Sequence, residues 1–168
     1  GVGACVQLGI DLELQLELAL LRAREVRAEK RHRYRIDDRA RAVAREVLPF
    51  RLTAAQKRAV REIVEDLRSP HPMLRLLQGD VGSGKTIVAL YAMLLAVAHG
   101  KQAALMAPTE ILARQHADTL ASLLEASCVK WALLTGSVST ADRRALLQQA
   151  ASGDLHVVLG THAVVQDD

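Results

Sequence analysis

The chain has 168 residues, the size of one domain with a short addition, because domains average roughly 150 residues. Half of the residues are hydrophobic and 24% are charged, which excludes a disordered tail and favours a globular chain with its own core. The formal net charge of +3 allows a polyanionic partner without requiring one. Only 2% of the residues are aromatic, which argues against a nucleic-acid surface that works by base stacking.

The cysteines and the apolar runs exclude further classes. Cys5 and Cys128 fit no CxxC spacing, so a disulfide framework and a zinc site are both disfavoured, and the cytoplasm is the expected compartment. The longest apolar run, residues 87–98, is shorter than the ~20 residues that a membrane helix needs, so we expect no membrane association. The chain starts at Gly1 and stops at Asp168 just after an apolar stretch, and we expect both ends to be cut.

Residues 1–48 differ in character from residues 49–168, and Pro49 marks the expected boundary. Apolar and polar side chains alternate over residues 10–18, which is typical of a strand, but the residues are Leu, Glu and Gln, which form helices well. We therefore predict a helix to about residue 33. Residues 22–45 hold ten basic and four acidic side chains, which form either a solvated helical face or a strip that meets nucleic-acid phosphates.

After Pro49, short apolar runs alternate with longer helical segments. Thr53 and Gln56 have the spacing of a capping box and predict a helix to about residue 67. The elements predicted after it are strand 73–78, helix 85–98, strand 102–107, helix 109–124, strand 130–134, helix 139–151 and strand 155–160. This alternation predicts an α/β fold, a parallel sheet with helices on both faces.

The segment Gly-Asp-Val-Gly-Ser-Gly-Lys-Thr at residues 79–86 matches the P-loop pattern G-x-x-x-x-G-K-[ST]. Glycines are needed where backbone N–H groups must approach phosphate oxygens closely, at the start of a helix. Lys85 would reach the β- and γ-phosphates, and the Thr86 hydroxyl would ligate Mg²⁺, so ATP and Mg²⁺ are the predicted cofactors. The predicted loop residues are Gly79, Asp80, Val81, Gly82, Ser83, Gly84, Lys85 and Thr86.

The residues around this loop resemble a known family. Residues 78–86 are similar to motif I of the RecG branch-migrating DNA helicases of the second helicase superfamily, and residues 106–116 to their motif Ia. The segment 48–56 resembles the one that leads into their first motor domain, where Gln56 would read the adenine. Residues 134–137 and 160–163 resemble two further loops that contact DNA, and the resemblance runs from about Leu48 to Gln166.

The resemblance implies a RecA-like motor domain over residues 49–168 and, over residues 1–48, a helical linker from an upstream DNA-binding wedge domain. It implies an ATP-dependent DNA helicase or translocase that branch-migrates forks and junctions in recombination and repair, with Lys85 and Thr86 as catalytic residues. The implied partners are branched double-stranded DNA and a second RecA-like domain; the oligomeric state stays open, with a monomer expected. The DNA-binding residues it implies are Thr109, Glu110, Arg114, Thr135, Gly136, Thr161 and His162.

Hydrolysis also needs an acidic residue on a strand to hold Mg²⁺. RecG relatives carry an Asp-Glu pair after the loop that residues 160–163 resemble, and this sequence has no Asp-Glu dipeptide. We therefore expect a motor domain truncated before its Walker B strand, with no meaningful ATP turnover by this piece alone. The alternatives are a self-contained P-loop ATP-binding or switch module, in which Asp80 would be the local acidic group, and an inactive remnant.

Overall fold

The computed structural model describes residues 4–7, 34, 42, 47 and 51–161, with the backbone alone for residues 4–7. The helix predicted to residue 33, most of the basic segment 22–45, the boundary at Pro49 and the site residue His162 lie outside these residues. The elements are β1 Ala4–Gln7, α3 Ala54–Arg68, α4 Lys85–Ala98, β2 Ala103–Met106, α5 Glu110–Leu124, β3 Trp131–Leu134, α6 Thr140–Ser152 and β4 Val157–Gly160. None of the described helices combines the length and apolarity that crossing a bilayer requires.

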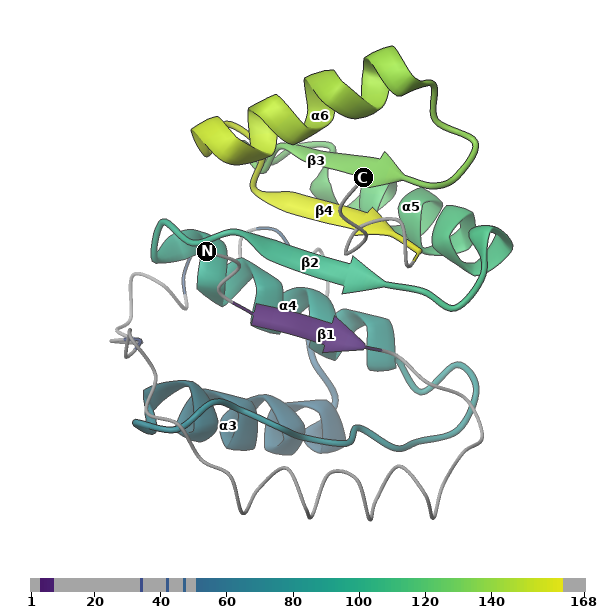
Figure 1. Cartoon of the computed structure of the whole chain (residues 1–168). Coiled ribbons are helices and arrows are strands. Elements are labelled where there is room, and N and C mark those ends of the chain that lie inside the picture. Colours follow the sequence, from purple (N-terminus) through teal and green to yellow (C-terminus); the bar gives the residue numbers. More distant parts are fainter. Residues whose placement is uncertain (1–3, 8–33, 35–41, 43–46, 48–50, 162–168) are drawn as a thin grey trace.

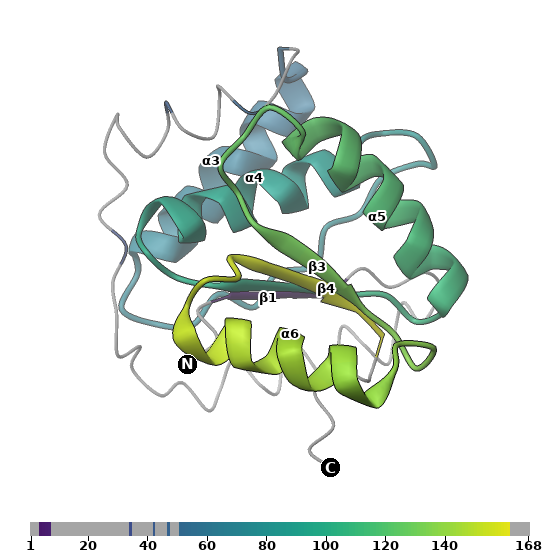
Figure 2. The same ribbon diagram turned by 90° about the horizontal axis from the view of Figure 1, so that it is seen from above.

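The strands form one parallel sheet in the order β1-β2-β4-β3 (Figure 1). Strand β4, the last in the chain, lies between β2 and β3. The connections between the parallel strands are therefore crossovers, and they run over both faces of the sheet. Helices α3, α4 and α5 lie on one face and α6 on the other (Figure 2). This arrangement confirms the predicted α/β class with helices on both faces.

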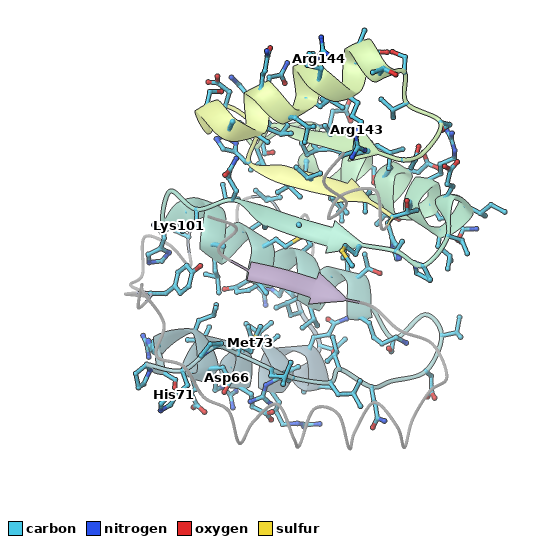
Figure 3. The ribbon with its side chains drawn as sticks, viewed as in Figure 1. Asp66, His71, Met73, Lys101, Arg143 and Arg144 are labelled. Atoms are coloured by element: carbon cyan, nitrogen blue, oxygen red, sulfur yellow. The ribbon has the colours of Figure 1, made fainter. Side chains whose placement is uncertain are left out.

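The predicted strand 73–78 is wrong. Residues 72–80 form no strand, and the fourth strand of the sheet is β1, which the sequence pattern did not single out. The Arg75 guanidinium in this segment donates to Asp66 Oδ2 on α3 at 2.7 Å and also pairs with Glu62, and the Asp66 hydrogen bond raises the pKa of Arg75. Asp66 lies on α3 close to the segment that contains Met73 (Figure 3). An apolar run becomes a strand only when a neighbouring backbone pairs with it, and here side chains hold the run against a helix.

Helix α4 forms the centre of the core. Every residue from Val88 to Ala96 is buried, because the helix packs against α3 on one side and against β1 and β2 on the other. A helix that is apolar all round is stable only when it is covered on all sides. Its predicted end is confirmed: Gly100 has φ +66°, its N–H donates to Val97 O at 2.9 Å, and Lys101 N–H donates to Ala96 O at 3.0 Å.

The predicted helix starts are confirmed by their caps. At α3 the Gln56 N–H donates to Thr53 Oγ1 at 3.2 Å while the Thr53 N–H donates to Gln56 Oε1 at 2.9 Å, a complete capping box. Thr109 caps α5 and Ser139 caps α6, each accepting a backbone N–H from three residues ahead. These caps fix where the helices begin, and therefore which residues lie in the loops before them.

Helix α6 covers its face of the sheet loosely. None of its residues is buried, and a cavity of about 200 Å³ lies between it and the sheet. Aliphatic side chains line the cavity, among them Leu146 and Ala150 of α6 and Val158 of β4. The main core therefore lies on the other face, between the sheet and helices α3, α4 and α5.

We expect Leu94→Ala to lower the free energy of unfolding by about 2–5 kcal/mol, because Leu94 in α4 is 0% exposed and the substitution leaves a cavity in the core. Leu147→Ala is the matched control, since Leu147 in α6 is 45% exposed and the same change there costs about 1 kcal/mol or less. Chemical denaturation followed by circular dichroism measures both. Equal losses for the two variants would contradict this description of the core.

Candidate functional site

Residues 79–84 form a tight loop that leads directly into α4. The Ser83 N–H donates to Asp80 O at 3.1 Å and closes the turn, while Gly82 and Gly84 take φ values of +79° and +82°. These left-handed values are ones that other residues rarely adopt, which explains both glycines. The Val81 side chain at the tip of the loop is fully exposed, so it does not cover the backbone of the loop.

Lys85 lies at the first position of α4 and turns its side chain back onto the loop. Its ammonium donates to Gly79 O at 2.5 Å and to Asp80 O at 3.0 Å. The first amides of a helix have no acceptor within the helix, and the helix dipole makes this end positive. Thr86 follows in the same turn and is half-buried. A lysine and a helix N-terminus thus converge on one loop, which suits an anionic group.

Gln56 connects α3 to the loop. Its Nε2 donates to Ser83 O at 3.1 Å, while its Oε1 accepts from Thr53 as part of the capping box. A Cβ on Gly84 would lie 2.3 Å from Gln56 Nε2, and one on Gly79 would lie 2.8 Å from Ser83 Oγ. A side chain at either glycine would displace the end of the Gln56 or Ser83 side chain, and the bare backbone suits the phosphates of a nucleotide.

The residues present place limits on a metal ion. No group of three or more His, Cys, Asp or Glu side chains within the described ranges could hold one. The Thr86 hydroxyl, in the first turn of α4, is the side chain that the P-loop pattern assigns to Mg²⁺. An Mg²⁺ ion at this loop would therefore need oxygens of the nucleotide as further ligands, as is usual for Mg²⁺ bound with phosphates.

The predicted DNA-contacting residues gather where the strands end. Met106, the last residue of β2, and Leu134, the last of β3, are both in register with Gly160 of β4, so the three loops that follow begin at one edge of the sheet. Thr109 and Thr161 lie in two of these loops. In Figure 1 the 79–84 loop lies at the same edge, toward which the strand arrows point. Carboxyl edges of parallel sheets are where such folds bind their ligands.

A hydrogen-bonded cluster joins α5 to the loop after β3. Arg114 Nη2 donates to Ser137 Oγ at 3.0 Å, and the hydroxyls of Ser137 and Thr135 lie 2.8 Å apart in a hydrogen bond. A Cβ on Gly136 would lie 3.2 Å from Glu110 Oε1. The structure thus brings together four of the predicted residues. It adds Ser137, which lies in the loop 134–137 but is not among the predicted DNA-binding residues.

Thr135 differs from the expectation of a side chain that reaches DNA. It directly follows β3 and is 2% exposed, so its side chain is buried. Arg114 and Gly136 are exposed, as a surface for phosphates requires. His116, farther along α5, is half-buried, and burial lowers its pKa. Arg114 is therefore the side chain in this cluster that carries a fixed positive charge.

The comparisons with known proteins agree with this geometry. The profile of the DEAD/DEAH box helicase family matches residues 53–168. An ATP-dependent DNA helicase RecG of Aquifex aeolicus is 47% identical over 148 residues, 88% of this chain and 19% of the relative. The RecG of Bacillus subtilis is 56% identical over 121 residues, 72% of this chain and 18% of the relative. The chain therefore spans about a fifth of the length of these relatives.

A solved structure described as RecG bound to a three-way DNA junction superimposes with a TM-score of 0.78 at 39% sequence identity. The match covers 92% of this chain and 21% of that one. Both comparisons confirm the resemblance that the motifs indicated and the α/β fold that goes with it.

We expect Gly84→Ala to weaken the binding of ATP with Mg²⁺ roughly tenfold or more, because the added Cβ strains the left-handed backbone and displaces Gln56 from Ser83. Isothermal titration of the protein that carries this chain measures the affinity. Gly153→Ala is the control, since Gly153 has φ +85° but nothing lies within 4 Å of an added Cβ. That variant should lose stability and keep its affinity; equal losses of affinity would contradict the role given to Gly84.

Proposed function

Because the chain belongs to the DEAD/DEAH box helicase family, we propose that the protein carrying it is an ATP-dependent DNA translocase that branch-migrates forks and junctions in recombination and repair. The observation that carries the proposal is that the phosphate loop and the predicted DNA residues share the carboxyl edge of one sheet. The identity of the RecG relatives, 47% and 56%, supports the substrate class.

Gly79 to Thr86 hold the nucleotide in this proposal. The backbone amides at the start of α4 and the Lys85 ammonium bind the phosphate oxygens. The lysine then gives up its hydrogen bonds to the carbonyls of Gly79 and Asp80 and donates to the phosphate instead. The Thr86 hydroxyl would help to hold Mg²⁺, which would neutralise part of the phosphate charge. Gln56 supports the loop through Ser83, and in the proposal it also reads the adenine.

The carboxyl-edge loops contact DNA in this proposal. The α5 N-terminus, with Thr109 as its cap, directs backbone amides to a phosphate, and Arg114 adds a positive charge one turn later. Gly136 is exposed and has no side chain, so the DNA backbone can approach the protein backbone closely at this position. Glu110 and Thr161 complete the set within the described residues, and His162 belongs to it by sequence.

The arrangement of the parent protein is also part of the proposal. Within residues 1–48, Ala4–Gln7 form β1 of the sheet, which corrects the predicted boundary. The proposal keeps the rest of this segment as the helical link from an upstream wedge domain and residues 49–168 as part of the first RecA-like motor domain. A second RecA-like domain supplies the remaining hydrolytic groups, and branched DNA is the partner of a cytoplasmic monomer. The matched structure, described as bound to a three-way junction, supports this assignment.

We expect Lys85→Ala to lower DNA-stimulated ATP hydrolysis at least about 100-fold, because it removes the charge that binds the transferred phosphoryl group. The measurement is phosphate release by the protein that carries this chain, with and without a three-way DNA junction. Lys101→Ala is the control and should hydrolyse ATP normally, since Lys101 lies at the opposite edge of the sheet, before β2 (Figure 3). The proposal would be overturned if Lys85→Ala hydrolysed ATP at the normal rate. It would also be overturned if the three-way junction did not change the rate of ATP hydrolysis by the protein with no substitution.

A further inference from the structure

We propose that Thr135 is a positioning residue, which acts through Ser137 to hold the Arg114 guanidinium ready for a DNA phosphate. This inference rests on the proposed function and refines it. It reassigns Thr135 from a residue that contacts DNA to one that orients a contact, and it gives Ser137 a role.

Thr135 is unusual in this fold. Among the residues that the structure describes, it is the one polar side chain as deeply buried as the apolar core, at 2% exposure. A buried hydroxyl is stable only with a hydrogen-bond partner, and Thr135 finds it in Ser137 Oγ, 2.8 Å away. A valine in this place would fill the same space without needing a partner. The polar residue is therefore best explained by the bond that it makes.

The bond fixes Ser137 in place. The Val138 N–H donates to Thr135 O at 3.2 Å, so the turn is closed by a backbone bond as well as by the side-chain bond. Ser139 then caps α6, which anchors the far side of the turn. The exposed Ser137 hydroxyl is thus tied to a buried residue and is ready to accept the Arg114 donor at 3.0 Å.

The position of Arg114 relative to Glu110 shows what the bond accomplishes. The two residues are four apart on α5, the spacing at which a glutamate and an arginine pair on a helix surface. In this structure the Arg114 guanidinium is bonded to Ser137 instead, and the Glu110 carboxylate lies beside Gly136. The hydrogen bond that the structure gives the Arg114 guanidinium is thus the one to Ser137, and no ion pair joins it to Glu110 among the described residues.

The consequence is a preorganised phosphate contact. A guanidinium has several N–H donors in a rigid plane, and one bond to Ser137 orients that plane while leaving the others available. An arginine already oriented loses less conformational freedom when it binds. The chemistry fits a single backbone phosphate at the carboxyl edge, beside the α5 N-terminus.

The test is the salt dependence of binding to a three-way DNA junction by the protein that carries this chain. Each phosphate contact adds about 0.9 to the slope of log K against log salt concentration. We expect Arg114→Gln to reduce the slope by about 0.9, and Ser137→Ala and Thr135→Val to reduce it similarly although neither changes the charge. Thr135→Ser keeps the hydroxyl and should keep the slope.

A control variant makes the test specific. Lys101→Gln removes a positive charge at the opposite edge and should leave the slope unchanged. If Arg114→Gln lowers the slope but Ser137→Ala and Thr135→Val do not, the positioning role is wrong and the proposed function stands. If the protein with no substitution fails to bind the junction, the proposed function fails and this inference with it.

Discussion

The site depends on the burial of α4. The residues from Val88 to Ala96 are enclosed between the sheet and α3, so the helix cannot shift along its axis without opening the core. Its N-terminus is therefore held at one place on the carboxyl edge of the sheet, together with Lys85 and the 79–84 loop. The packing of α4 therefore places both the positive end of its dipole and the Lys85 ammonium at the 79–84 loop. The position of the 79–84 loop therefore follows from the way in which the core is filled.

Strand β2 connects this buried helix to α5 at the carboxyl edge of the sheet. It packs against α4 and leads, after three residues, into α5 with Glu110 and Arg114. The same strand pairs with β4, whose end is in register with the ends of β2 and β3. The 79–84 loop and the proposed DNA-contacting residues Glu110 and Arg114 therefore belong to one packed body, and a change in the position of α4 has a direct physical path to α5.

Local signals in the sequence predicted most of these elements. The P-loop pattern, the Thr53–Gln56 capping box and the glycine after α4 each specify a backbone conformation through nearby residues, and the structure has all three. The strand predicted at 73–78 is wrong because sheet pairing depends on a distant backbone, which composition does not encode. Strand β1 was missed for the same reason, since it has only four residues, Ala4–Gln7, and no distinctive pattern.

The site was predicted less completely than the fold. The order of motifs brought Glu110, Arg114, Thr135 and Gly136 to one edge, and the structure places them together. The burial of Thr135 could not be predicted, because it depends on how the chain turns after the last residue of β3, Leu134. Ser137 was passed over because its significance lies in a hydrogen bond to Arg114, 23 residues away in the sequence.

The most direct measurement is an experimental structure of the protein that carries this chain, bound to a non-hydrolysable ATP analogue and a three-way DNA junction. We expect the Lys85 ammonium to leave the carbonyls of Gly79 and Asp80 for the β- and γ-phosphates, and Arg114, still bonded to Ser137, to contact a DNA phosphate. Nucleotide bound elsewhere with Lys85 still on its loop carbonyls, or DNA on another face of the sheet, would contradict this expectation.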